Sequence, residues 1–545
     1  MAIEQATEKI NCPSLKERRK EVERLLVACG LARGPRRLLL RATPNAHRQD
    51  QIRTLREVLE ILGPVFSSFG LYLATRIDLL SGRDCLEFAE IEDSAEPSQP
   101  AVVRDLIRRE IGRPLDEVFL SFEELPFESS LLFQKHHARL RDGRKITIKI
   151  VRAEIEEQLI QDVELLPLLK FALGAITTYP AVENAIEDFR FMLLRRIDLT
   201  HEATGLDSLA RNAQTFGLLS PASVEPSLCT PRMLTVECLP GTSLSKLLSH
   251  ASENRETVFT GPFQTYDLAR RLCVLWLWQA LHGSVFPVEI STDDVVVLPG
   301  RQIGFTGGVF ANLSPESKNN LWNYLVAAAS DSPNQACAFL IKELKRSESV
   351  ESEGELQQKF RQVVPLRDTE WGGDLFADHL FVQWRLANEH GYLARQSLPS
   401  FFRGLYGVAE LARQLSPQRD AFAQALEDVR LIASMEWFKE MLAPDQFGRQ
   451  MNQYAALMFE LPQRLDEALT LVAEGRTQSR SPMRETHERE RRQNSSAIMA
   501  ALLLVLATFV ILVQHAGMNE AWADSIKAFM FIALGACVLR AASRG

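Results

Sequence analysis

The residue of this chain best placed for chemistry is a lysine in the middle of a predicted strand. Residues 138–151 read ARLRDGRKITIKIV, two runs joined by Asp142-Gly143, and this dipeptide is a strong signal for a β-hairpin. Because side chains alternate along a strand, the three isoleucines of the second run share one face and Lys149 lies on the other. Such a lysine is either a solvated surface group or a fixed positive charge for an anionic ligand such as a phosphate.

Other familiar chemistries have no signature here. The chain has no G-x-S-x-G, H-E-x-x-H or G-x-G-x-x-G motif. Its eight cysteines include no C-x-x-C pair and its ten histidines are dispersed, so neither a zinc site nor a redox pair is predicted. A net charge of -8 argues against nucleic acid as a partner. The length of 545 residues allows two or more domains.

The elements around Lys149 are predicted in a recognisable order. Helical patterns follow the hairpin, and the short strand MLTVECLPG ends at a Pro-Gly turn. The chain is then mainly helical, with two short apolar strands joined by Pro299-Gly300. The ranges are 153–173 and 182–217 for the helices, 233–241 for the first strand, and 295–298 and 302–305 for the pair. This is the order of a bilobal protein kinase, in which a strand lysine pairs with nucleotide phosphates.

Three further stretches precede the hairpin. Residues 14–60 are predicted as helices rich in Arg and Lys, whose basic face is either solvated or in contact with anionic lipid or an acidic partner. Residues 62–81 form a more apolar helical segment that contains Gly70. A surface loop is predicted between Glu87 and Pro100, and residues 101–125 are predicted as helix.

The C-terminal end is predicted to meet a bilayer. A charged linker over 476–496 precedes residues 497–514, which carry no charge and are long enough to span roughly 27 Å as a helix. A second apolar run follows at 528–539, and arginines flank both runs. The positive-inside rule places both ends in the cytoplasm. The alternative is a helical hairpin buried in a soluble core.

The chain resembles the UbiB/AarF/ADCK family of atypical kinases, which are linked to isoprenoid-quinone biosynthesis, from about residue 60 to about residue 320. The resemblance is carried by four stretches: VFSSFGLYLATRIDLLS, PFESSLLFQKHHARLRDGRKITIKIVRAEIEEQ, LLRRIDLTHEATGLDSLARN and HGSVFPVEISTDDVVVLPGRQIGFTGGVFANLSPE. A C-terminal transmembrane hairpin is typical of bacterial UbiB proteins. The family framework is kept around each motif, whereas the motifs themselves are often changed.

The nucleotide-binding motifs of the family are partly kept. Lys149 matches the family's nucleotide lysine, and Gln134 and His136 match its Ala-rich loop. The resemblance therefore implies that these three residues bind nucleotide. Three positions of that loop that are small in the family hold larger residues here: Glu128, Leu131 and Phe133. Small residues are needed there because backbone amides must approach phosphate closely. The family's K-x-G-Q motif matches residues 68–71, of which only the glycine is kept; its Lys and Gln positions hold Ser68 and Leu71.

The family's E-x-D motif matches RIDLTHEA. Asp198 and Glu202 are kept, and the first glutamate has become Arg196, a reversal of charge. Asp198 is thus a further candidate for the nucleotide site, and Lys149 is either a nucleotide contact or a member of an ion pair, with Asp198 as its predicted partner.

The catalytic and metal-binding motifs are changed further. The family's H-A-D-x-H-P-G-N falls on HGSVFPVE, where Ser284 takes the aspartate position and Glu289 the asparagine position. Thr306 takes the metal-binding aspartate position of D-F-G. Magnesium on a phosphate needs hard oxygen ligands, usually a carboxylate, so Glu289 is the candidate metal ligand. The alternative is that Glu289, like Asp293 and Asp294, is a solvated loop acid.

The resemblance implies an α+β, bilobal protein-kinase-like fold. The domains expected are an N-terminal helical extension (1–110), a kinase-like N-lobe (111–240), a helical C-lobe (241–475), the charged linker (476–496) and a two-helix transmembrane hairpin (497–541). ATP and Mg²⁺ are the implied cofactors. Membrane lipids, quinone-biosynthesis enzymes or isoprenoid-quinone intermediates are the implied partners, at the cytoplasmic face of the inner membrane.

Two functions agree with these motifs. The first is a pseudokinase that supports ubiquinone biosynthesis as a regulatory or scaffold protein. The second is a divergent ATPase or kinase that uses Lys149 and an altered metal site. The loss of the D-F-G and catalytic-loop aspartates and the reversed charge at Arg196 favour the first.

Overall fold

The computed structural model describes residues 14–31, 45–153, 156–174, 179–213, 217–253, 262–299, 302–346, 353–362, 375–395 and 397–442. The helices and strands below lie in the unit Met1–Phe438, apart from the last residues of α18. Within these residues no helix is both long and apolar enough to cross a bilayer. The linker predicted over 476–496 and the hairpin predicted over 497–541 lie outside the described residues.

Four helices open the described chain: α1 (Leu15–Ala28), α2 (Asn45–Leu62), α3 (Pro64–Ala74) and α4 (Gly82–Ala89). Ser14 and Glu17 form a capping box that satisfies the first amides of α1. The basic face predicted for this region is partly internal, because Arg18 is buried and its Nε lies 2.8 Å from Asp162 of α7 (Glu156–Leu165). This ion pair ties the N-terminal helix to the body of the protein.

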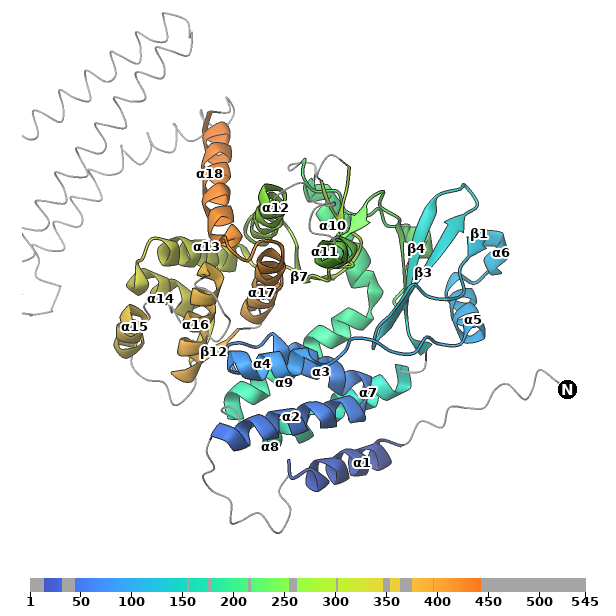
Figure 1. Ribbon diagram of the computed structural model, residues 1–545, viewed down its shortest axis with the longest axis horizontal. Coiled ribbons are helices and arrows are strands. Elements are labelled where there is room, and N and C mark those ends of the chain that lie inside the picture. The colour runs from blue at the N-terminus through green and yellow to red at the C-terminus, as the bar shows by residue number, and fades with distance from the viewer. Residues whose placement is uncertain are drawn as a thin grey trace, which may run out of the picture. The chain divides into compact units, whose positions relative to one another are not determined.

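A small antiparallel sheet follows, built around the predicted hairpin. Its strands are β1 (Phe119–Phe122), β2 (Glu128–Ser129), β3 (Phe133–Leu140), β4 (Lys145–Val151) and β5 (Met233–Glu237), in the order β1-β3-β4-β5 with β2 on β3. Gly143 supplies the positive φ of the turn between β3 and β4. The three isoleucines of β4 are buried with Val103, Leu106 and Ile107 of α5 (Pro100–Ile111), so Lys149 faces away from α5. Figure 1 shows α5 on one side of β3 and β4, and α10 and α11 on the other.

The helix predicted over 101–125 is shorter than expected. It ends at Gly112, whose φ of 71° belongs to a left-handed helix cap. A single turn, α6 (Leu115–Val118), then leads into strand β1. Phe119 is buried and opposite Leu140 of β3, and this edge pairing overrides the helical pattern of the sequence.

The rest of the described chain is mainly helical. Helices between β4 and β5 are α7, η2 (Leu166–Leu169), α8 (Lys170–Leu173), α9 (Tyr179–Ile197), α10 (Leu199–Ala213) and η3 (Pro226–Leu228). Those after β5 are α11 (Leu244–Glu253), α12 (Pro262–Leu281), α13 (Pro315–Ala329), α14 (Pro333–Lys342), α15 (Glu353–Gln362), α16 (Phe376–Glu389), α17 (Ser397–Leu415) and α18 (Ala421–Leu442). The α+β character predicted from the sequence is confirmed, with a small sheet lobe and a helical lobe.

Short strands cross the helical lobe. The two predicted strands form β8 (Val295–Val297) and β9 (Ile303–Phe305), which pair with each other and with β6 (Thr242–Ser243). Two further pairs were not predicted: β7 (Phe286–Glu289) with β10 (Val309–Ala311), and β11 (Leu344–Arg346) with β12 (Tyr392–Ala394). The strands of these two pairs are far apart in the sequence, so no turn signal marks them. Strands of three or four residues are also too short to show a period of two.

The Arg18–Asp162 pair generates a stability prediction. Arg18→Ala should lower the free energy of unfolding by about 3 kcal/mol, because it leaves the buried Asp162 carboxylate without its cation. Urea denaturation followed by circular dichroism would measure this loss. The matched control is Arg19→Ala on the same helix, whose pair with Glu23 is largely exposed and should change stability by less than about 0.5 kcal/mol. Equal effects of the two substitutions would contradict the buried role of Arg18.

Candidate functional site

A cleft with a volume of about 480 Å³ lies against the face of the sheet opposite the isoleucines. Its polar wall is made by two strand lysines, Lys135 on β3 and Lys149 on β4, and by carboxylates from the helical lobe. Its apolar wall is made by β5 and β8, with Leu234, Val236 and Val296. The cleft therefore has the place of a nucleotide site in a kinase-like fold, and its polar contacts decide its chemistry.

Lys149 is held in an ion pair with Glu202, near the start of α10. Its Nζ lies 2.8 Å and 3.0 Å from the two carboxylate oxygens, and both side chains are largely buried. The backbone amide of Gly308 donates to the same carboxylate at 2.8 Å. A strand lysine paired with a helix glutamate is an arrangement that protein kinases need for activity. One part of the kinase machinery is therefore in place.

The sequence predicts Asp198 as the partner of Lys149, and the structure corrects this. Asp198 accepts hydrogen bonds from the Thr200 amide at 3.1 Å and from the Thr200 hydroxyl at 2.6 Å, at the start of α10. A side chain that satisfies the first amides of a helix is a cap. One helical turn later, Glu202 points toward the cleft instead.

Lys135 forms a second ion pair beside the first. It lies directly across the hairpin from Lys149, and its Nζ is 2.8 Å from both Asp294 Oδ1 and Glu128 Oε2. Asp294 is buried, whereas the sequence suggested a solvated loop acid; its neighbour Asp293 is exposed. The ammonium group of Lys135 can enter this side of the cleft because β3 and β4 present the same face at these two positions.

The charges of this second pair stabilise each other. Burial alone would lower the pKa of Lys135, but Asp294 and Glu128 raise that pKa above its ordinary value. Burial alone would raise the pKa of Asp294, but Lys135 and Lys149 hold it below its usual range. For Glu128 burial prevails and raises the pKa despite the nearby lysine. Asp294 is accordingly the main counter-ion of Lys135.

Gly307 joins the two ion pairs. A Cβ atom at this position would lie 2.6 Å from Glu202 Oε1 and 3.2 Å from Asp294 Oδ1. The carboxylates of both pairs thus pack against the same glycine, and a side chain there would push Glu202 away. The T-G-G sequence that replaces D-F-G fits the contacts of this chain, because a glycine leaves room for the two acids.

Arg196, the reversed charge of the E-x-D motif, has counter-ions of its own. Its guanidinium lies 3.6 Å from Glu289 and 3.8 Å from Asp93. Burial alone would lower the pKa of Arg196, and the charges of these two acids raise it above its usual value. Glu289, the metal ligand suggested by the sequence, thus faces a cation within the protein. Phe133 lies under both cations, with its ring centre 4.4 Å from Lys149 Nζ and 5.7 Å from the Arg196 guanidinium carbon.

Gln134 and His136 lie on the opposite face of β3 from Lys135. They are the strand partners of Ile150 and Ile148, and both are fully buried. Gln134 donates to Ser129 at 3.4 Å, and His136 Nδ1 lies 3.0 Å from the Glu123 carbonyl oxygen. The structure therefore does not bring these two predicted residues together with Lys149 in the cleft.

The oxygen atoms of the cleft do not fit a catalytic magnesium ion. Thr306, at the D-F-G aspartate position, offers a neutral hydroxyl 3.4 Å from Asp294 Oδ1. Ser284, at the catalytic-loop aspartate position, accepts a hydrogen bond from Asn212 at 3.0 Å and does not line the cleft. Of the carboxylates that line it, Glu128, Glu202 and Asp294 have lysine partners, and Asp293 accepts a hydrogen bond from the Ser245 hydroxyl. Across the described residues, no group of three or more histidine, cysteine or acidic side chains is placed to hold a metal ion.

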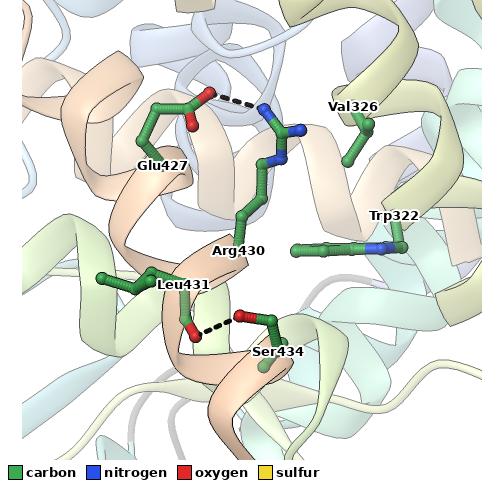
Figure 2. Close-up of a pocket in the computed structure, with 7 residues that line it drawn as sticks. Trp322, Val326, Glu427, Arg430, Leu431 and Ser434 are labelled. Atoms are coloured by element: carbon green, nitrogen blue, oxygen red, sulfur yellow. Dashed lines mark hydrogen bonds and ion pairs between the residues drawn. The ribbon is translucent and has the colours of Figure 1, made fainter. Parts of the chain in front are cut away.

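A second hollow, of about 670 Å³, lies between α13 and α18 (Figure 2). Trp322 and Val326 line one side and Leu431 the other, and the polar pair Glu427–Arg430 belongs to a single helix. Unlike the ion-paired cleft, this hollow brings no reactive groups together. The cleft lined by Lys135 and Lys149 is therefore the candidate functional site.

The sequence signalled some of these residues and missed others. Lys149 and Glu202 stand at matched motif positions, whereas Lys135 and its partners do not. The register of the predicted hairpin does contain the signal, because Lys135 and Lys149 are equidistant from Asp142 and must therefore share a face. The partnership with Asp294 joins residues 159 positions apart, and no local pattern indicates it.

Comparisons with known proteins agree with this geometry. A model of the ABC1 atypical kinase-like domain matches residues 90–338. A protein of Pseudomonas paraeruginosa named "Probable protein kinase UbiB" is 25% identical over 485 residues, which is 86% of each chain. One of the same name from Shewanella baltica is 23% identical over 475 residues, or 84% of each chain. The solved complex of Rv3197 with erythromycin from Mycobacterium tuberculosis gives a TM-score of 0.41 at 16% identity over 60% of this chain and 84% of that one, too low to carry an argument.

The family match covers the sheet, the Lys149–Glu202 pair and the cleft, and the full-length relatives extend it over most of the chain. The family resemblance predicted from the sequence is therefore confirmed: residues 90–338 match the ABC1 atypical kinase-like domain, and the chain is similar over most of its length to proteins named UbiB.

Proposed function

We propose that this chain is a pseudokinase, which uses a kinase-like cleft for binding or scaffolding and does not transfer phosphoryl groups. One observation carries the proposal: where a kinase holds its metal ion, Thr306 offers no carboxylate, and the neighbouring carboxylate of Asp294 is already paired with Lys135. A nucleotide polyphosphate needs free positive charge, supplied in kinases by a lysine and by metal ions held on carboxylates. Here the metal-ligand position is a threonine, and the lysines have other partners.

The charge balance of the cleft supports this proposal. Its lining includes three lysines, Lys135, Lys149 and Lys246, against four carboxylates, Glu128, Glu202, Asp293 and Asp294. Removing one partner from a buried ion pair leaves an unpaired charge, at a cost of about 3–5 kcal/mol. A polyphosphate that took Lys135 from Asp294 would meet that cost and would also face an excess of negative charge. Without a metal ion, the site disfavours such a ligand.

The wider role proposed is support of ubiquinone biosynthesis at a membrane. The relatives named UbiB and the family resemblance suggest this role, with quinone-biosynthesis enzymes or isoprenoid-quinone intermediates as partners. The apolar runs within 497–541, flanked by arginines, support a membrane hairpin with the kinase-like part on the cytoplasmic side. In this arrangement the cleft is a structural element of a protein held at the bilayer surface.

A divergent ATPase is the second candidate. The Lys149–Glu202 pair favours it, because this contact belongs to the active arrangement of kinases. The same pair also serves a pseudokinase, since it holds β4 to α10 whether or not a nucleotide is bound. The two functions differ in what the chain does with ATP.

The first test is therefore ATP turnover. We expect the purified full-length protein, in detergent with anionic lipid, to show no Mg²⁺-dependent ATPase above background. A lost metal carboxylate should depress turnover by about two orders of magnitude or more, since each 1.36 kcal/mol is a factor of ten in rate. Lys149→Ala should leave complementation of a quinone-deficient strain largely intact, provided that the wild-type chain complements.

Robust turnover would decide for the ATPase. If ATP hydrolysis were present in the wild-type protein and lost in both Lys149→Ala and Glu289→Ala, the acid at 289 would have taken over a metal and the pseudokinase proposal would fail. Lys145→Ala is the matched control, because this lysine is exposed on the same strand.

The second test concerns the membrane. Deleting residues 497–545 should move the protein from the membrane fraction to the soluble fraction with its fold intact, because a charged linker carries few core contacts. Fractionation followed by thermal denaturation of the soluble protein would measure both effects. Release of the full-length chain by high salt alone, or aggregation of the shortened chain, would argue against a membrane hairpin.

A further inference from the structure

We propose that the ammonium group of Lys135 stands in for the divalent cation in this cleft. The inference rests on the proposed loss of phosphoryl transfer and deepens it, because it names what replaces the metal. It starts from the disagreement between the family's magnesium site and the contacts of this chain. Two carboxylate oxygens of the kind that bind a cation are present, but the ammonium group of Lys135 already lies between them.

Lys135 has the surroundings of a bound cation. Its Nζ is 2.8 Å from a carboxylate oxygen of Asp294 and 2.8 Å from one of Glu128. The Thr306 hydroxyl approaches the same Asp294 oxygen at 3.4 Å. The two carboxylates are hard oxygen donors of the kind that magnesium or manganese takes, and the hydroxyl donates to one of them. They meet beside the position where the family has its metal-binding aspartate.

Asp294 supplies the carboxylate that residue 306 lacks. It precedes β8, whereas Thr306 follows β9, and the two are brought together because β8 and β9 pair. The Thr306 amide also donates to the Asp294 carbonyl oxygen at 2.9 Å, which fixes the two residues relative to each other. Asp294 thus places a carboxylate beside residue 306 from a different position of the chain.

The charge count explains why no metal accompanies this carboxylate. Lys135 and Lys149 together balance two of the three buried or half-buried acids Glu128, Glu202 and Asp294. Without Lys135, Lys149 would be the one lysine among the described residues in an ion pair with these three acids, and the excess of negative charge would attract a cation. Lys135 therefore keeps out the metal by charge as well as by volume. The carboxylates raise its pKa, so the ammonium stays charged at neutral pH.

The test uses Mn²⁺ alone as the probe, on the full-length protein in detergent. Mn²⁺ binding is measured by electron paramagnetic resonance, and the melting temperature is measured in Mn²⁺ and in EDTA. The wild-type chain should bind no Mn²⁺ in the cleft and melt at the same temperature in both. Lys135→Ala should bind one Mn²⁺ ion at least about tenfold more tightly than the wild type, a difference of about 1.4 kcal/mol or more, and its melting temperature should rise with Mn²⁺.

Controls assign the new site. Lys135→Ala combined with Asp294→Asn should lose the gained Mn²⁺ site, and Lys145→Ala should behave as wild type, because Lys145 is exposed outside the cleft. If Lys135→Ala does not fold, Lys135→Gln keeps a shorter polar side chain without the charge, and it too should gain Mn²⁺ binding.

Two outcomes would overturn the inference. The first is Mn²⁺ binding by the wild-type chain that Asp294→Asn abolishes. The second is a folded Lys135→Ala or Lys135→Gln variant with no gain of Mn²⁺ binding. The proposed function fails separately, through ATP turnover. A wild-type chain that binds Mn²⁺ but does not hydrolyse ATP would refute the role of Lys135 and leave the pseudokinase proposal standing.

Discussion

A charge buried in a protein has to be neutralised, and in this cleft the chain neutralises its own cations. Lys149 is held by Glu202, Lys135 by Asp294 and Glu128, and Arg196 by Glu289 and Asp93. The two lysine pairs join the small sheet to α10 and to the loop before β8, and the Arg196–Glu289 pair joins α9 to β7. The lobes of a kinase-like fold usually meet over a nucleotide and its metal. In this protein ion pairs make the same connection.

Several changed motif residues have neighbours that balance the change in charge or volume. The reversed charge at Arg196 is matched by an acid at 289, so that a cation and an anion have both been introduced. The threonine at 306 is matched by Asp294 beside it, and the glycine at 307 leaves room for the carboxylates of Glu202 and Asp294. Random loss of motifs would leave unpaired buried charges, which are strongly destabilising. In this chain the changed positions are instead accommodated by ion pairs.

The features of the site that depend on local sequence patterns could be predicted. The Asp142-Gly143 turn and the alternating isoleucines predict the hairpin and the side of the sheet on which Lys149 lies, and the structure has both. The sequence predicts the wrong partner for Lys149, because Asp198 and Glu202 both lie near the start of α10. Which of the two faces the strand depends on the phase of the helix. The pairing of Lys135 with Asp294 depends on how distant segments pack. Strands of three or four residues, such as β7 and β10, likewise depend on the packing around them.

The pseudokinase proposal is tested most directly by whether the cleft binds a nucleotide together with its metal ion. Isothermal titration calorimetry of the full-length protein with ATP, in the presence of Mg²⁺ and in EDTA, measures this directly. We expect no binding of ATP that depends on Mg²⁺, because Thr306 supplies no metal-binding carboxylate and the carboxylates of Asp294 and Glu202 are held by lysines. Stoichiometric binding of ATP that requires Mg²⁺ and disappears in Lys149→Ala would contradict it.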